Sequence, residues 1–259
     1  MTVDVLTQVP DDPSGPPIVF VHGAWHANWC WADTFMPYFV DHGHPVHAPS
    51  LRGHGESPSS RSLGWVRGRD YVADVASVVD SLDQAPVVVG HSMGGYVVQK
   101  LIEERPVRGA VLLASVPPRG VFDVTQRIAR TNPKLFLELN LKRSLFPLVN
   151  SEERVRAELF SAATPDAVVA ATAARLQDES YLAFLDMLAF DLPRPSKVNS
   201  PVMVLGATED AIFPPKQVEA TAAAYGTKAD FVEAGHNVMM EAAWQEAAGK
   251  INSWIKTLP

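Results

Sequence analysis

The segment 87–96 constrains the fold of this chain more than any other stretch. Its three consecutive valines are typical of a short buried strand, and a helical pattern begins at about residue 94 and continues to 104. Between strand and helix lies Gly90-x-Ser92-x-Gly94, the pattern of a sharp strand-to-helix turn. Glycine tolerates backbone conformations that side chains forbid, so such a turn presents the Ser92 hydroxyl at its apex. The free N–H groups and the positive end of the following helix point to the same place.

Strands and helices alternate along most of the chain. Apolar runs predict buried strands at 18–21, 45–48, 87–89, 107–114, 201–205 and 229–233. Helical periodicity lies between or after them, at 29–40, 69–82, 94–104, from about 215, and at 239–256. This alternation predicts an α/β fold: a mostly parallel sheet with helices on both faces.

The alternation stops at 118–197, where we find helical segments and no strand. They lie near 123–131, 133–142, 151–162, 165–177 and 179–190. A capping box and two N-cap residues followed by proline predict where some of them begin, at Asp123 with Gln126, Asn132-Pro133 and Thr164-Pro165. We therefore predict a core of residues 1–117 and 198–259 with a helical cap insertion at 118–197.

Composition excludes several classes of partner. The net charge is −7 and no lysine or arginine cluster stands out, so we expect no nucleic-acid surface. Residues 1–17 lack an apolar segment, and no apolar run approaches the roughly 20 residues of a membrane span, so we expect neither an ordinary secretion signal nor a membrane span. Cys30 is the only cysteine, which excludes an intrachain disulfide and favours the cytoplasm. The sequence does not indicate the oligomeric state.

A serine hydroxyl needs a general base to act as a nucleophile, and the base needs an orienting acid. On this architecture the acid and the histidine follow the serine in that order, after later strands. Asp210 follows the strand at 201–205, and His236 follows the strand at 229–233. We predict Ser92 as nucleophile, His236 as general base and then general acid, and Asp210 as orienting acid. Glu209, beside Asp210, is the alternative acid.

The negative charge of a tetrahedral intermediate requires an oxyanion hole of two main-chain N–H groups. We assign one to Met93, directly after the nucleophile, and the other to Ala24, in the loop after the first apolar strand. Trp25 and His26 adjoin this loop and are candidates for substrate contact. The tryptophans at 25, 29 and 31 have an equally plain interpretation as core residues. We expect structural roles for His54 and His91, and no metal or organic cofactor.

Together these motifs make the chain resemble the α/β-hydrolase superfamily over nearly its full length. The matching elements are His22-Gly23-Ala24-Trp25-His26, Arg52-Gly53-His54-Gly55-Glu56-Ser57, Gly90-His91-Ser92-Met93-Gly94-Gly95, Asp210…Pro214 and Gly235-His236. Segment 22–31 is similar to the branch of methyl-salicylate-type esterases and hydroxynitrile lyases. The turn motif at 90–95 is also usual in monoacylglycerol lipases and general carboxylesterases. Pro214, four residues after Asp210, fits the superfamily pattern with Asp210 as the acid.

Two positions depart from the lyases of that branch. In the lyases that this segment resembles, a threonine occupies the position of Gly23 and a lysine occupies the position of Asn237. The resemblance therefore implies a serine hydrolase of small apolar carboxylic esters, acting through an acyl-enzyme, with little cyanohydrin cleavage. Lactone, carbon–carbon or amide hydrolysis is the alternative chemistry, and a ligand receptor on a hydrolase scaffold is the alternative without turnover.

Overall fold

A computed structural model describes residues 3–259 of the chain. Its seven-stranded sheet has the order β1-β3-β2-β4-β5-β6-β7. The strands are β1 Val5–Gln8, β2 Ile18–Val21, β3 Val46–Pro49, β4 Val87–His91, β5 Gly109–Leu113, β6 Val202–Ala207 and β7 Ala229–Val232. Only the pairing of β1 with β3 is antiparallel, so the predicted mostly parallel sheet is confirmed.

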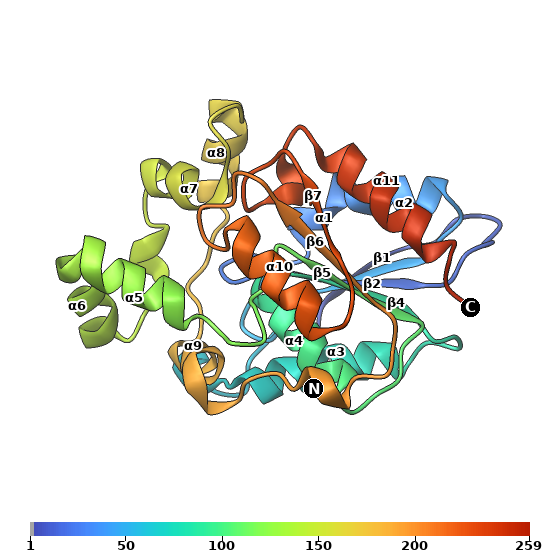
Figure 1. Ribbon diagram of the computed structural model, residues 1–259, viewed down its shortest axis with the longest axis horizontal. Helices are drawn as coiled ribbons and strands as arrows, with labels where there is room; N and C mark the ends of the chain where they lie inside the picture. Colours follow the sequence, from blue (N-terminus) through green and yellow to red (C-terminus); the bar gives the residue numbers. More distant parts are fainter. Residues whose placement is uncertain (1–2) are drawn as a thin grey trace.

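Helices cover both faces of the sheet (Figure 1). The helices of the core are α1 Trp29–Ala32, α2 Phe35–Asp41, α3 Gly68–Val79, α4 Met93–Ile102, α10 Pro215–Ala224 and α11 Trp244–Ile255. Alternate residues of β4 separate the two layers: Val88 packs with α3, α4 and α10, whereas Val87 and Val89 pack with α1, α2 and α11. A strand buried on both faces must be apolar throughout, which explains the unbroken valine run.

The helices between β5 and β6 gather at one end of the sheet (Figure 1). They are α5 Phe122–Thr131, α6 Pro133–Lys142, α7 Glu152–Leu159, α8 Asp166–Ala173 and α9 Tyr181–Leu185, which continues as a π-helix at Asp186–Phe190. We call the predicted range 118–197 the insert; its boundaries stay a prediction. The carboxyl ends of β4, β6 and β7 face the insert, and parallel sheets bind ligands at such ends.

Local differences from the sequence prediction have tertiary causes. β1 was not predicted, because it is a half-buried edge strand that pairs only with β3. The helix predicted at 29–40 is two helices, and Thr34 between them donates a hydrogen bond to Met239. The last helix begins at residue 244 rather than 239, after a 3₁₀ turn at Val238–Met240.

Of the three start signals in the insert, one is confirmed. The Asn132 side chain accepts a hydrogen bond from Leu135 N–H, with proline at the first helical position. The capping box at Asp123 is wrong, because α5 begins at Phe122 without a side-chain cap. The cap at Thr164 is also wrong, because this hydroxyl donates to Glu241 instead.

Candidate active site

Ser92 occupies the turn between β4 and α4 in a strained conformation. Its φ of 53° and ψ of −118° are unusual for a residue with a side chain, and such strain concentrates at functional sites. A Cβ atom at Gly90 would overlap the carbonyl of Gly94, and a Cβ at Gly94 would overlap the carbonyl of Val21. Both glycines are therefore required for the close approach of α4 to the sheet. The turn holds Ser92 where the sequence pattern predicts.

Asp210 and His236 come together at the ends of β6 and β7. Nδ1 of His236 donates to Oδ2 of Asp210 over 2.9 Å, and both side chains are buried. Oδ1 of Asp210 accepts the main-chain N–H groups of Ile212 and Phe213, at 2.7 and 2.9 Å. The aspartate is thereby fixed, and it holds the imidazole with its proton on Nδ1. Glu209, the alternative acid, is exposed.

The other ring nitrogen of His236 is available for chemistry. Nε2 is buried, and within residues 3–259 it has no hydrogen-bond partner. The centroid of the His236 ring is 4.8 Å from that of His91 and 5.6 Å from that of Phe213. His91 is the chain neighbour of Ser92, and Phe213 lines the same cavity as Ser92, so the imidazole lies next to the turn that carries the serine. This is the arrangement that a general base needs, and the contact tightens in many enzymes only when substrate binds.

Two residues with unpaired main-chain N–H groups line the same cavity within residues 3–259. Ala24 and Met93 both line it, and across the described residues 3–259 neither N–H donates to a protein acceptor. The Gly23–Ala24 peptide is oriented by His22, whose Nδ1 donates to the Gly23 carbonyl over 2.8 Å. Nε2 of His22 in turn accepts the N–H of Leu51 at 2.9 Å. A rigid peptide with a free N–H is what an oxyanion hole requires.

His22 was not predicted as part of the site. Burial holds the pKa of His22 well below its ordinary value, and the charge of His54 lowers it further. The ring is therefore neutral, with one donor and one acceptor nitrogen, which matches its two partners. The motif that placed Ala24 begins at His22, and that adjacency was the available signal.

The two candidates for substrate contact have different positions. Trp25 lines the cavity, with a φ of 66° that few residues with a side chain adopt. His26 is not among the residues that line the cavity, which corrects the expectation of substrate contact. It is 1% exposed, its Nδ1 donates to the Ala24 carbonyl over 2.7 Å, and its Nε2 accepts from Asn237. Burial lowers the pKa of His26 to about 4.

His91 and His54, for which structural roles are expected, each join two parts of the chain. Nε2 of His91 donates to the carbonyl of His236 over 2.9 Å, so it fixes the main chain of the proposed base. Nε2 of His54 pairs with the buried carboxylate of Glu179 at 3.2 Å. Burial lowers the pKa of His54, but the charge and hydrogen bond of Glu179 outweigh it, so that the pKa is raised. His54 therefore joins its loop to the insert.

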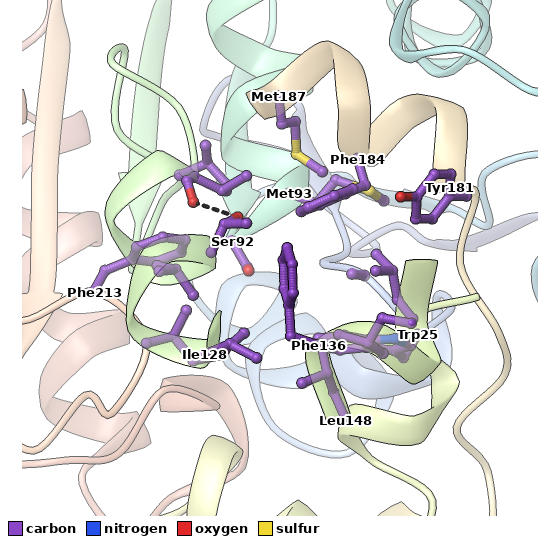
Figure 2. A pocket seen from close by; sticks show the side chains of 18 of the residues that line it. Trp25, Ser92, Met93, Ile128, Phe136, Leu148, Tyr181, Phe184, Met187 and Phe213 are labelled. Carbon is purple, nitrogen blue, oxygen red and sulfur yellow. Dashed lines mark hydrogen bonds between the residues drawn. The ribbon is translucent and has the colours of Figure 1, made fainter. Parts of the chain in front are cut away.

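The cavity in front of Ser92 is apolar and enclosed largely by the insert. Figure 2 shows the ring of Phe136 at its middle, with Ser92, Met93, Phe184 and Trp25 around it. Apart from Ser92, its polar lining side chains are those of Thr125, Asn140, Tyr181 and Trp25. No lysine, arginine, aspartate or glutamate belongs to this lining. Among residues 3–259, no cluster of histidine, cysteine and acidic side chains could hold a metal ion, and no helix is long and apolar enough to cross a bilayer.

Comparisons with known proteins identify the family and similar folds. The profile described as the alpha/beta hydrolase family matches residues 18–249. A non-heme chloroperoxidase of Streptomyces lividans is 39% identical over 40% of this chain and 38% of its own length. Salicylic acid-binding protein 2 of Nicotiana tabacum is 29% identical over 56% of this chain and 57% of its own. A thermophilic esterase from Thermogutta terrifontis superposes with a TM-score of 0.71, at 22% identity, over 98% of this chain and 93% of the esterase.

Proposed function

Because this chain belongs to the alpha/beta hydrolase family, we propose that it is a serine hydrolase of neutral carboxylic esters. The observation that carries the proposal is the buried pair of His236 and Asp210, which fixes the imidazole proton on Nδ1 and leaves Nε2 free beside the Ser92 turn. An oriented neutral imidazole near a serine hydroxyl is the requirement for nucleophilic acyl transfer.

The reaction has two acyl-transfer steps at one site. Oγ of Ser92 attacks the ester carbonyl, and its proton passes to Nε2 of His236. The carbonyl oxygen becomes negative and accepts hydrogen bonds from the N–H groups of Ala24 and Met93. The imidazolium then gives its proton to the departing alcohol, leaving an acyl-enzyme. A water molecule, deprotonated by the same nitrogen, releases the acid and restores Ser92.

The cavity favours neutral apolar substrates. Its lining combines aromatic rings with aliphatic and methionine side chains and contains no ionised side chain. A carboxylate placed there would lose its hydration without gaining a partner, which costs several kcal/mol. We propose small aryl or medium-chain esters as the substrate class.

Ligand retention without turnover is the second candidate, because the relative from Nicotiana tabacum is named for salicylic acid binding. An apolar cavity lined by aromatic rings could also hold a small aromatic ligand of this kind. Turnover separates the two functions: a receptor would bind the acid tightly and hydrolyse esters slowly.

A panel of aryl esters with graded acyl length tests the proposal, together with one isostere that carries a carboxylate. We expect multiple turnover on neutral esters, and a kcat lower by roughly 10⁴ or more in Ser92→Ala. Ser115→Ala, a buried serine outside the cavity lining, is the matched control and should keep its activity. Faster cleavage of the charged isostere, or full activity of Ser92→Ala, would refute the proposal.

A further inference from the structure

Glu241 is a buried carboxylate that no step of the proposed reaction uses. It follows the 3₁₀ turn Val238–Met240 and is 3% exposed. Oε1 accepts two main-chain N–H groups, from Ser161 at 2.6 Å and from Gly235 at 3.0 Å. Oε2 accepts two hydroxyls, from Ser161 at 2.9 Å and Thr164 at 2.7 Å. One side chain thus joins the insert to the loop that carries His236.

Both chain neighbours of His236 are held against the insert. Gly235 donates its N–H to Glu241, and Asn237 donates its N–H to the carbonyl of Leu159 over 2.8 Å. The approach at Gly235 is close, because a Cβ there would lie 2.5 Å from the Ser161 nitrogen. The main chain of the proposed base therefore has little freedom to move relative to residues 159–164.

The carboxylate has no cationic partner in the described part of the chain, residues 3–259. A buried carboxyl group is costly unless its oxygen atoms find donors. Four donors meet that requirement here, two of them main-chain groups on different segments. Such an arrangement fixes geometry, because any shift of either segment would leave a buried oxygen or N–H group without its partner.

We propose that Glu241 is a positioning residue, which sets the place of His236 by holding residues 235–237 against residues 159–164 of the insert. This inference rests on the proposed function. The insert then has two roles: it encloses the substrate, and through Glu241 it determines where the base stands relative to Ser92. A misplacement of about 1 Å can cost roughly 10²-fold in rate.

Glutamine at position 241 should preserve this arrangement. Its oxygen can accept the same two main-chain N–H groups, and its amide can donate to the hydroxyls of Ser161 and Thr164, which accept as well as donate. Alanine removes all four hydrogen bonds. The pair Glu241→Gln and Glu241→Ala therefore separates the hydrogen-bond geometry from the negative charge.

The test measures kcat and KM for a neutral aryl ester, and the downfield proton resonance of His236 Nδ1–H. We expect Glu241→Ala to lower kcat about 10²-fold with KM changed less than about threefold, and to broaden or shift the resonance. Glu241→Gln should stay within about fivefold of the parent in kcat and keep the resonance. Glu246→Ala, on an exposed part of α11, is the matched control.

If Glu241→Ala does not fold, Thr164→Val replaces it, with an expected three- to tenfold loss of kcat from one missing hydroxyl. An unchanged kcat and resonance in the folded variant would overturn the inference, as would equal losses in the alanine and glutamine variants. Failure of the parent protein to hydrolyse any ester refutes the proposed function instead. In that case the resonance alone decides whether Glu241 positions His236.

Discussion

Within residues 3–259, Nδ1 of His236 is hydrogen-bonded to Asp210, whereas Nε2 has no partner. Substitution of Asp210 tests whether this aspartate is the orienting acid. Asp210→Asn should lower kcat by about 10⁴, because an amide can donate to Nδ1 and so favour the tautomer that lacks a free Nε2 lone pair. Glu209→Gln should leave kcat unchanged, since that side chain is exposed. Steady-state kinetics on one aryl ester measure both. The reverse ranking of the two variants would move the acid role to Glu209.

At Gly23 there is no room for a side chain beside Ser92. A Cβ there would lie 2.8 Å from Nδ1 of His91 and 3.0 Å from Cβ of Ser92. Gly23→Ala should therefore reduce kcat and destabilise the fold by about 1–3 kcal/mol, the usual cost of overpacking. Urea unfolding and ester turnover of the variant provide the two measurements. Parent-like stability and kcat would show that the loop yields easily.

The crowding around Gly23 also separates this protein from the hydroxynitrile lyases. Asn237, which stands where the lyases carry a lysine, is buried, does not line the cavity, and donates to His26. Threonine at position 23 together with lysine at position 237 would thus require rearrangement of both loops. We expect little or no cyanohydrin cleavage from the parent protein when cyanide release from mandelonitrile is compared with hydrolysis of an aryl acetate. Equal rates would contradict the ester proposal.

The sequence predicted the positions of some site residues and not of others, for a physical reason. Ser92, Asp210 and His236 each follow a strand, and parallel strands bring their carboxyl ends to one edge. Three of the four hydrogen bonds of Glu241 come from Ser161 and Thr164, about 80 positions away in the sequence, so no local pattern indicates its role. His26 adjoins the oxyanion loop in sequence, yet its side chain turns back to the main chain.

At the scale of elements, buried carboxylates attach the insert to the core at three places. Glu241 accepts from Ser161 and Thr164, and Glu179 accepts the hydroxyl of Tyr71 at 2.5 Å. Asp186, in the π-helix, accepts the N–H of Gly68 at 2.9 Å and pairs with Arg67. Each carboxylate meets donors from a different part of the chain. The insert is therefore fixed by directional bonds as well as by apolar contact.

Helix α6 offers a direct test of the cavity, because adjacent residues face opposite ways. Phe136 projects into the cavity (Figure 2), whereas Leu137 is 58% exposed. Phe136→Ala should raise KM for a bulky aryl ester by about tenfold, a loss of about 1.4 kcal/mol of apolar contact, with less effect on a small acetate. Leu137→Ala is the control. Equal effects of the two variants on KM would show that the substrate lies elsewhere.

The order of the strands and helices was predictable from the sequence, whereas the residues at which they begin and end were predicted less accurately. Apolar runs identified the parallel strands, because a strand buried on both faces has few polar residues. β1 has a half-buried pattern and exists through its pairing with β3, which is not visible locally. The last helix begins late because residues before it form the turn that leads to Glu241.

At the scale of the whole molecule, three buried neutral histidines make stability depend on pH. Burial lowers the pKa of His26 to about 4 and holds the pKa values of His22 and His91 well below the ordinary range. The folded state therefore binds fewer protons than the unfolded state in mild acid. Their contribution is complete above the unfolded pKa of about 6.5 and is lost as the pH falls toward the folded values.

We predict that the free energy of unfolding decreases as the pH is lowered from 7 to 5. Each of the three histidines contributes up to about 1.4 kcal/mol per pH unit, and their sum approaches 4 kcal/mol per unit near the lower end. The pKa of His54 is raised, so its contribution to stability has the opposite pH dependence. That contribution is present at low pH and is lost as the pH rises. Urea titrations across this range measure the slope, with His42→Gln, an exposed histidine, as control. A flat profile would contradict the neutral state of these rings.

The identity of the nucleophile is the central claim, and covalent labelling tests it most directly. A fluorophosphonate reacts with a serine only where a base and an oxyanion hole activate its hydroxyl. Peptide mass spectrometry of the labelled protein should find one adduct, on Ser92, and none in Ser92→Ala. Asp210→Asn should label far more slowly than the parent. Stoichiometric labelling of Ser92→Ala, or an adduct on another serine of the parent protein, would contradict the account.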